Sequence, residues 1–278
     1  MPNIAIVGSG LIGRAWAITF ARAGHEIRLY DEIAGQAEKA IAFAREMAAP
    51  LEKEGLLNDQ SADQVIARIK PAASLEAALD GAAHVQENTP EDVAVKQKVF
   101  SQLDAVAAPD TVLASSTSAI LPSKFTEHLK GRGRCLVMHP INPPYLIPAV
   151  EIVPAPWTAP ETVEKTRLLA VASGQAPIVM KRELDGFVMN RMQGALLEEA
   201  FRLVADGYAS VEDVDVGIRE GLALRWSLMG PFETIDLNAP GGVKDYCERY
   251  QQIYERLFPS MQRRVDWSGE VMKTVEKE

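Results

Sequence analysis

A glycine-rich turn between a strand pattern and a helix pattern constrains this chain most. The apolar run at residues 3–7 leads into Gly8, Gly10 and Gly13 with GxGxxG spacing, and a helical pattern with small residues follows. Such a turn lets the backbone approach a pyrophosphate, and the helix points its free N–H groups at the phosphates. The next strand ends in Asp31, about 20 residues on, as a dinucleotide fingerprint requires. We therefore predict a Rossmann domain whose cofactor contacts include Gly8, Gly10, Leu11, Ile12, Gly13 and Asp31.

The acidic residue that ends the second strand also selects between the two nicotinamide cofactors. Its carboxylate can accept hydrogen bonds from the adenosine ribose, whereas it repels a 2′-phosphate. The next residue, Glu32, adds a second negative charge. The sequence therefore predicts NAD, and not NADP, as the cofactor.

Short β-branched runs alternate with longer helical patterns through the first part of the chain. This alternation is typical of a parallel sheet wrapped by helices. We expect strands at residues 3–7, 26–30, 84–86, 111–115, 135–138, 150–153 and 178–180. The clearest helical patterns cover residues 12–23, 34–54, 91–106 and 160–172.

The β-branched runs stop after Asp185, and the chain then has helical patterns throughout, beginning with an apolar-periodic stretch at residues 186–206. We therefore predict an NAD-binding domain over residues 1–184 and a helical substrate and dimerisation domain over residues 185–278. The expected fold class is α/β, an N-terminal Rossmann domain followed by a smaller all-α domain. Because the helical domain is small and apolar along its faces, we expect it to form a homodimer.

The net charge and the cysteines limit the classes of partner, metal site and compartment that we expect. The formal net charge of −9 repels phosphate backbones and anionic lipid, and no apolar run is long enough to span a bilayer. We expect neither nucleic acid nor a membrane as a partner. No signal peptide is evident at the N-terminus, and Cys135 and Cys247 lie far apart without metal-binding spacing. We therefore expect no metal site and a cytoplasmic location.

One of the four histidines stands apart as a candidate acid–base residue. His139 ends an apolar strand and enters the proline-rich turn HPINPPYLIP, at the edge of the sheet where open α/β folds bind ligands. Glu151 follows in the next apolar run, where a chain that turns back could bring its carboxylate beside the imidazole. A histidine paired with a carboxylate suits proton transfer near neutral pH.

The chain resembles the 3-hydroxyacyl-CoA dehydrogenase superfamily over nearly its whole length, and within it the branch of lambda-crystallin and L-gulonate 3-dehydrogenase. The motifs that carry the resemblance are GSGLIG with Asp31, ENTPEDVAVK at 87–96, ASSTSAILPS at 114–123, HPINPPYLIPAVEIVP at 139–154, DGFVMNR at 185–191 and EGLALRWSLMGPFET at 220–234.

The resemblance implies roles for several of these residues. His139 would exchange the proton and Glu151 would orient and charge it, while Ser115 and Asn190 would hydrogen-bond the reacting oxygen. Asn142 is expected near the nicotinamide or the substrate. Glu91 and Lys96 would contact the cofactor, although both also suit a solvated first turn of a helix.

Two departures bear on the substrate. Acyl-CoA members of the family usually have Ser-Asn where this chain has Ser115 and Ser116, and HPINPPY differs from their HFFNPV and follows the gulonate and carnitine dehydrogenases. Arg225 lies between apolar residues, where its guanidinium could hold a substrate carboxylate through two N–H···O bonds. We therefore expect a small free hydroxy acid such as L-gulonate as the substrate.

Three alternatives stay open at this point. The chain could act on a 3-hydroxyacyl-CoA thioester or on carnitine, or it could be a crystallin-like protein that binds NADH without turnover. A third reading is a dehydrogenase related to 6-phosphogluconate dehydrogenase, which would require a catalytic lysine where this chain has DGFVMNR.

Overall fold

The computed structural model describes residues 3–278, and the chain divides into two compact units. The first unit ends at Met189 and the second begins at Asn190, five residues after the boundary that the composition predicts. The difference has a local cause, because the backbone N–H groups of Val188 and Met189 donate hydrogen bonds to Glu151 in the first unit.

The first unit contains an eight-stranded sheet in the order β3-β2-β1-β4-β5-β6-β7-β8. Neighbouring strands pair in parallel, except that β7 runs antiparallel to β6. The α/β fold class is confirmed, while the short edge strand β3 was not expected. The strands are β1 (Asn3–Val7), β2 (Glu26–Tyr30), β3 (Ile69–Pro71), β4 (Ala82–Glu87), β5 (Val112–Ser115), β6 (Cys135–Pro140), β7 (Ala149–Pro154) and β8 (Ala176–Val179).

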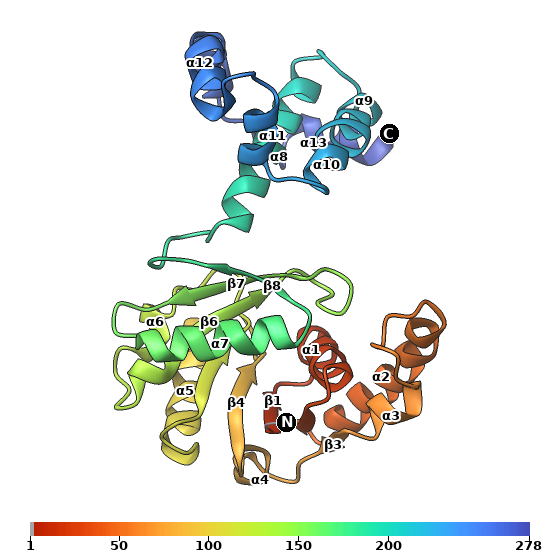
Figure 1. Ribbon diagram of the computed structural model, residues 1–278, viewed down its shortest axis with the longest axis vertical. Helices are drawn as coiled ribbons and strands as arrows, with labels where there is room; N and C mark the ends of the chain where they lie inside the picture. The colour runs from red at the N-terminus through yellow and green to blue at the C-terminus, as the bar shows by residue number, and fades with distance from the viewer. Residues whose placement is uncertain (1–2) are drawn as a thin grey trace. The chain divides into compact units, whose positions relative to one another are not determined.

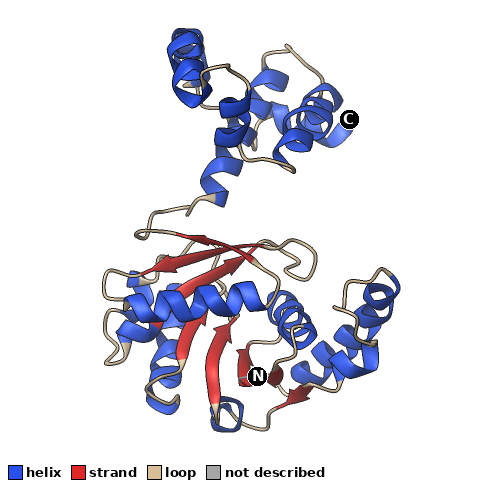
Figure 2. Cartoon of the chain, in the orientation of Figure 1, coloured by secondary structure: helices blue, strands red, loops and turns tan. Residues whose placement is uncertain are grey.

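Helices cover both faces of this sheet (Figure 1). Alternate residues of β1 point to opposite faces, so Ile4 and Ile6 pack in one core with Trp16 and Ala170, while Val7 packs in the other with Phe100. Figure 2 shows the alternation of strands and helices that the sequence predicts. The helices are α1 (Leu11–Arg22), α2 (Gln36–Lys53), α3 (Ala62–Ile66), α4 (Leu75–Leu79), α5 (Val93–Val106), α6 (Ser123–Thr126), α7 (Pro160–Ala172) and the 3₁₀ turn Arg132–Arg134.

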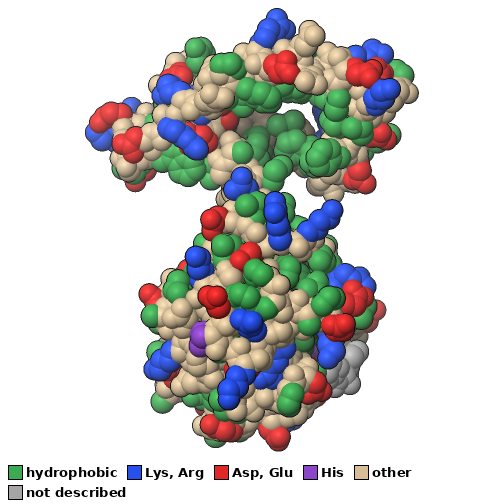
Figure 3. Space-filling view, turned by 90° about the vertical axis from the view of Figure 1, so that its left-hand side faces the viewer, with side chains coloured by type: hydrophobic (Ala, Val, Ile, Leu, Met, Phe, Trp, Pro, Cys, Tyr) green, Lys and Arg blue, Asp and Glu red, His purple; other side chains and the backbone are tan. Residues whose placement is uncertain are grey.

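The second unit is helical. Its first helix, α8, begins one residue before the unit, at Met189 and not at Gly186 as predicted, because Gly186 and Phe187 have φ angles of 76° and 49°, outside the helical region. Many large hydrophobic side chains of this unit stay at its surface (Figure 3). The segments are α8 (Met189–Ala205), α9 (Val211–Val216), a π-helical segment (Gly217–Leu222), α10 (Ala223–Trp226), α11 (Pro231–Leu237), α12 (Gly242–Met261) and α13 (Glu270–Lys277). Within residues 3–278, no helix combines the length and apolarity needed to cross a membrane.

Candidate active site

The glycine turn after β1 lies where the strand order reverses, because β1 pairs with β2 on one side and with β4 on the other. Gly8 has a φ of 86°, and a Cβ there would lie 2.9 Å from the carbonyl carbon of Asn88. A Cβ on Gly13 would collide with the carbonyl oxygen of Gly8. A Cβ on Gly10, by contrast, would meet only open space at the start of α1. The turn is therefore packed on its inner side and open where a pyrophosphate would approach.

A hollow of about 780 Å³ adjoins this turn, lined by residues that include Gly8, Gly10 and Asp31. The Asp31 carboxylate accepts hydrogen bonds from the Ser9 N–H at 2.7 Å and from the Ser9 hydroxyl at 2.8 Å. Leu11, in the first turn of α1, is 58% exposed. The hollow, the open glycine and the acidic residue together suit the adenosine and pyrophosphate of NAD.

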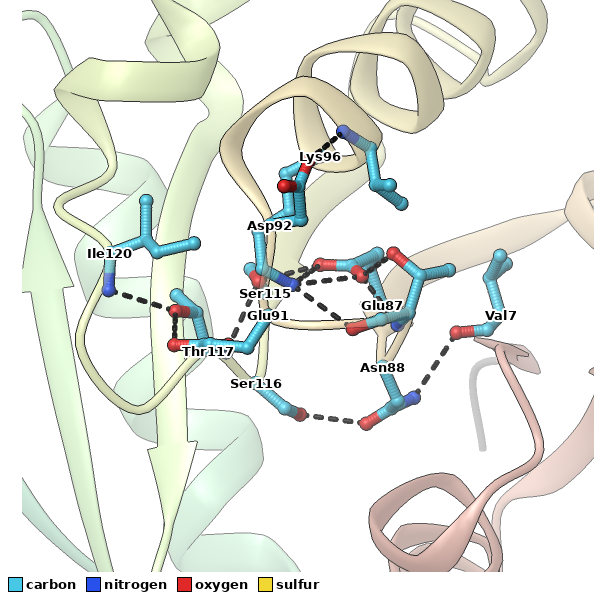
Figure 4. Close-up of polar contacts among 12 residues, drawn as sticks. Val7, Glu87, Asn88, Glu91, Asp92, Lys96, Ser115, Ser116, Thr117 and Ile120 are labelled. Carbon is cyan, nitrogen blue, oxygen red and sulfur yellow. Dashed lines mark hydrogen bonds and ion pairs between the residues drawn. The ribbon is translucent and has the colours of Figure 1, made fainter.

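A fully buried ion pair lies at the carboxyl end of β4 (Figure 4). Both oxygens of Glu87 lie 3.1 Å from the Lys96 ammonium, which also donates to the carbonyl oxygen of Thr89 at 3.3 Å. The backbone N–H of Thr89 donates to the same carboxylate at 2.5 Å. The side chain of Lys96 is therefore buried and directed inward at Glu87, and the cofactor contact that the resemblance implies for it stays a prediction.

The structure places Ser115, which was expected to contact the reacting oxygen, in the protein interior. This residue pairs with Glu87 across β4 and β5, its side chain is fully buried, and its hydroxyl donates to Glu87 Oε2 at 2.6 Å. Its hydroxyl hydrogen is therefore directed at a buried carboxylate. The exposed hydroxyl of this segment belongs to Ser118, in the loop after β5. The sequence did not single out Ser118, because the run of hydroxyl residues does not reveal where the strand ends.

Ser116 occupies the position where acyl-CoA relatives have Asn. Its hydroxyl donates to Asn88 Oδ1 at 2.7 Å and accepts from Gln86 Nε2 at 2.7 Å and from Trp16 Nε1 at 3.0 Å. The Ser116 hydroxyl thus links α1, β4 and the segment after β4 to the loop after β5.

His139 and Glu151 meet as the register of β6 and β7 dictates. They are direct partners in the antiparallel ladder, and His139 Nδ1 lies 2.7 Å from Glu151 Oε2. The other carboxylate oxygen accepts from the backbone N–H groups of Val188 at 2.7 Å and Met189 at 2.8 Å. The Phe187 ring packs 5.8 Å from the imidazole, centroid to centroid. The backbone N–H groups thus orient the carboxylate, and the Phe187 ring packs beside the imidazole.

The remaining predicted residues lie in other places. Asn142 is exposed in the turn after β6, and Glu91 lies between β4 and α5 with its carboxylate on the loop after β5. Asn190 and Arg225 belong to the helical unit, the first lining a hollow of about 610 Å³ within that unit and the second exposed on α10. No group of three or more side chains placed to hold a metal ion occurs among the described residues.

Comparison with known proteins agrees with the geometry. A nucleotide crevice at the reversal of strand order, with a paired histidine and glutamate near the same sheet edge, defines a nicotinamide-dependent oxidoreductase. The family model for the 3-hydroxyacyl-CoA dehydrogenase NAD binding domain matches residues 3–183, and the model for its C-terminal domain matches residues 186–276. The chain belongs to the 3-hydroxyacyl-CoA dehydrogenase family, and its cofactor is NAD.

Several individual proteins are similar over most of the chain. A lambda-crystallin homolog from Bos taurus is 42% identical over 274 residues, which cover 98% of this chain and 85% of that protein. An L-carnitine dehydrogenase from Pseudomonas putida is 38% identical, with 90% of this chain and 77% of that protein covered. The solved structure of 5-formyl-3-hydroxy-2-methylpyridine 4-carboxylic acid 5-dehydrogenase, described as an NAD⁺-dependent dismutase, aligns with a TM-score of 0.85 at 30% identity, covering 100% of this chain and 86% of that one.

Proposed function

We propose that this protein oxidises the 3-hydroxyl of a small hydroxy acid such as L-gulonate, or reduces the corresponding ketone. The observation that carries the proposal is the His139–Glu151 pair at the carboxyl end of β6, with Nδ1 and Oε2 2.7 Å apart. NAD, when bound, accepts hydride from the carbon that bears the hydroxyl. The protein must then take the hydroxyl proton and steady the charge that develops on the oxygen.

His139 is the base in this proposal. Its Nδ1 hydrogen is directed to Glu151, so the lone pair of the neutral imidazole lies on Nε2, which we assign as the atom that takes the proton. Burial raises the pKa of Glu151, but hydrogen bonds from the imidazole and from two backbone N–H groups outweigh burial and lower that pKa below its ordinary value. The carboxylate therefore stays negative and stabilises the imidazolium that forms.

A hydroxyl and an amide complete the arrangement. We assign to Ser118 the contact with the reacting oxygen that the resemblance implied for Ser115, because Ser118 is exposed and follows β5, the neighbour of β6. Asn190, at the start of the helical unit, is the proposed amide donor. Two neutral donors suit an alkoxide-like oxygen.

We place the carboxylate of the hydroxy acid on Arg225. Its guanidinium is exposed, and the similarity to a dehydrogenase whose name contains a carboxylic acid supports a free acid as substrate.

The proposed function is tested by a screen of hydroxy acids and 3-hydroxyacyl thioesters with NAD, in which turnover is measured by the absorbance of NADH. Arg225→Met should raise KM for a hydroxy acid about 10-fold or more. Turnover of thioesters alone would replace the hydroxy acid by an acyl-CoA substrate, and an unchanged KM would remove Arg225 as the contact of the substrate carboxylate.

A second candidate is a binding protein without turnover, which the similarity to lambda-crystallin homologs favours. It predicts NADH binding with no oxidation of any compound in the same screen. The presence of His139, Glu151 and an exposed serine supports the enzyme.

We further propose a cytoplasmic location, because Cys135 and Cys247 are both free thiols and suit a reducing compartment.

A further inference from the structure

The loop that follows β5 is wrapped around a single oxygen of Glu91. Glu91 Oε1 accepts hydrogen bonds from the Thr117 hydroxyl at 2.5 Å and from the backbone N–H groups of Ser118 and Ala119, each at 3.0 Å. The Ser118 hydroxyl lies 3.4 Å from the same oxygen. Thr117 Oγ1 in turn accepts from the Ile120 N–H at 2.9 Å, as Figure 4 shows.

Successive backbone N–H groups that converge on one point form a nest, a concavity that favours an anion. Here the chain supplies the anion itself. Burial raises the pKa of Glu91, but hydrogen bonds from the 117–119 loop and the positive charge of Lys96 outweigh burial and lower the pKa below its ordinary value. The carboxylate is therefore ionised at neutral pH, and its oxygen is the acceptor around which the loop is folded.

Glu91 is itself fixed from the strand behind it. The backbone N–H and the hydroxyl of Thr89, two residues earlier, both donate hydrogen bonds to the buried Glu87 carboxylate. Asp92, the next residue, caps α5 by accepting from the Val95 N–H at 2.9 Å. The carboxylate thus extends from a segment that is bonded to β4 at one end and to α5 at the other. Its oxygen therefore has a fixed position for the hydrogen bonds from the loop.

We propose that Glu91 is a positioning residue, whose carboxylate holds residues 117–120 in the conformation that keeps Ser118 at the sheet edge near the end of β6. The inference rests on the proposed function, since it gives Ser118 a reacting oxygen to contact. The loop uses Oε1 of this carboxylate, so the positioning role is separate from any cofactor contact made through Oε2. Loss of Glu91 should therefore lower kcat by a larger factor than the affinity for NADH.

The experiment compares Glu91→Ala and Glu91→Gln in the full chain, with the exposed Glu164→Gln as a control from the same unit. Three quantities are measured: kcat and KM for the hydroxy acid found in the screen, the Kd of NADH, and amide hydrogen exchange at residues 118 and 119. In Glu91→Ala, kcat should fall about 10- to 100-fold, because misplacing a reacting group by about 1 Å has effects of that size. The two amides should exchange about 10-fold faster or more, as expected when the loop opens locally.

The conservative variants sharpen the result. Glu91→Gln keeps a carbonyl oxygen for the nest and should retain most of kcat, whereas Thr117→Val removes one donor and should lower kcat in the same direction as Glu91→Ala. An unchanged kcat in Glu91→Ala overturns the proposal, as does a loss of NADH affinity by the same factor as kcat/KM, which would make Glu91 a cofactor contact. If the wild type turns over no hydroxy acid, the proposed function fails, while the exchange of the two amides still decides whether Glu91 holds the loop.

Discussion

His139 Nδ1 lies 2.7 Å from Glu151 Oε2, because the two residues face each other across the antiparallel β6–β7 pair. Directly opposed residues of such a pair project to the same side of the sheet, so the contact follows from strand register and needs no loop to form it. The second oxygen of Glu151 accepts two backbone N–H groups from the segment before α8. Proton transfer in the proposed reaction therefore depends on a pair fixed by backbone geometry.

Replacing the imidazole tests this directly. His139→Gln should lower kcat by about 10²- to 10⁴-fold, the usual contribution of general acid–base help, and leave the Kd of NADH nearly unchanged. Glu151→Gln should lower kcat less, because the amide still accepts from the imidazole but carries no charge to stabilise imidazolium. Steady-state kinetics and NADH fluorescence titration provide the two measurements. Wild-type turnover in His139→Gln would rule out the assigned base.

The buried Glu87–Lys96 pair makes a separate prediction about stability. Lys96→Met should destabilise the protein by about 3–5 kcal/mol, because it leaves a fully buried carboxylate without its counter-charge. The double variant Glu87→Gln with Lys96→Met should recover much of the loss, since neither charge remains. Urea denaturation at pH 7 measures the free energy of unfolding.

The exposed pair of Lys70 and Glu26, with its charged atoms 3.8 Å apart, supplies the control. Lys70→Met should change the free energy of unfolding by less than about 1 kcal/mol, as is typical of surface ion pairs. Equal effects for Lys70→Met and Lys96→Met would contradict the role given to burial.

Much of the nucleotide-binding part could be predicted because its signals are local. The glycine spacing with Asp31 fixed the cofactor class, and the approach of Glu151 to His139 required only that the chain turn back after β6. The edge strand β3 has three residues, too few to show an alternating pattern. The residues assigned in the helical unit, Asn190 and Arg225, stay predictions.

The direction of individual side chains is harder to predict from the sequence. Ser115 is the last residue of β5 and pairs with Glu87, but four consecutive hydroxyl residues conceal the strand end in the sequence. Lys96 did carry a signal, because Lys96, Phe100 and Leu103 recur at helical spacing and form the buried face of α5. A lysine on such a face needs a buried counter-charge, and the acidic residue that ends β4 provides it.

The surface of the helical unit leads us to propose that a second copy of the chain covers it. No residue of α12 is buried, and its hydrophobic residues Ile253, Leu257 and Met261 recur every fourth position, with Tyr254 and Phe258 beside them. Light scattering should give about twice the chain mass of 30.4 kDa. Leu257→Glu with Phe258→Glu should give a monomer, while Gln251→Glu on the same helix should not. A monomeric wild type would refute the homodimer.

A buried histidine predicts how stability depends on pH. His84 is fully buried, and burial lowers its pKa from 6.5 to about 4, against a hydrogen bond with Gln86 that acts in the opposite direction. Above pH 6.5 the ring is neutral in both the folded and the unfolded chain, so it adds no pH dependence there. As the pH falls from 6.5 toward 4, only the unfolded chain takes up the proton, so the free energy of unfolding should decrease by roughly 3 kcal/mol, at about 1.4 kcal/mol per pH unit.

His84→Gln should lose this slope between pH 6.5 and 5, above the range in which most carboxylates titrate, whereas the exposed His128→Gln should keep it. Urea denaturation across that range decides the matter, since equal slopes in wild type and His84→Gln would mean that His84 takes up a proton as readily in the folded chain as in the unfolded one.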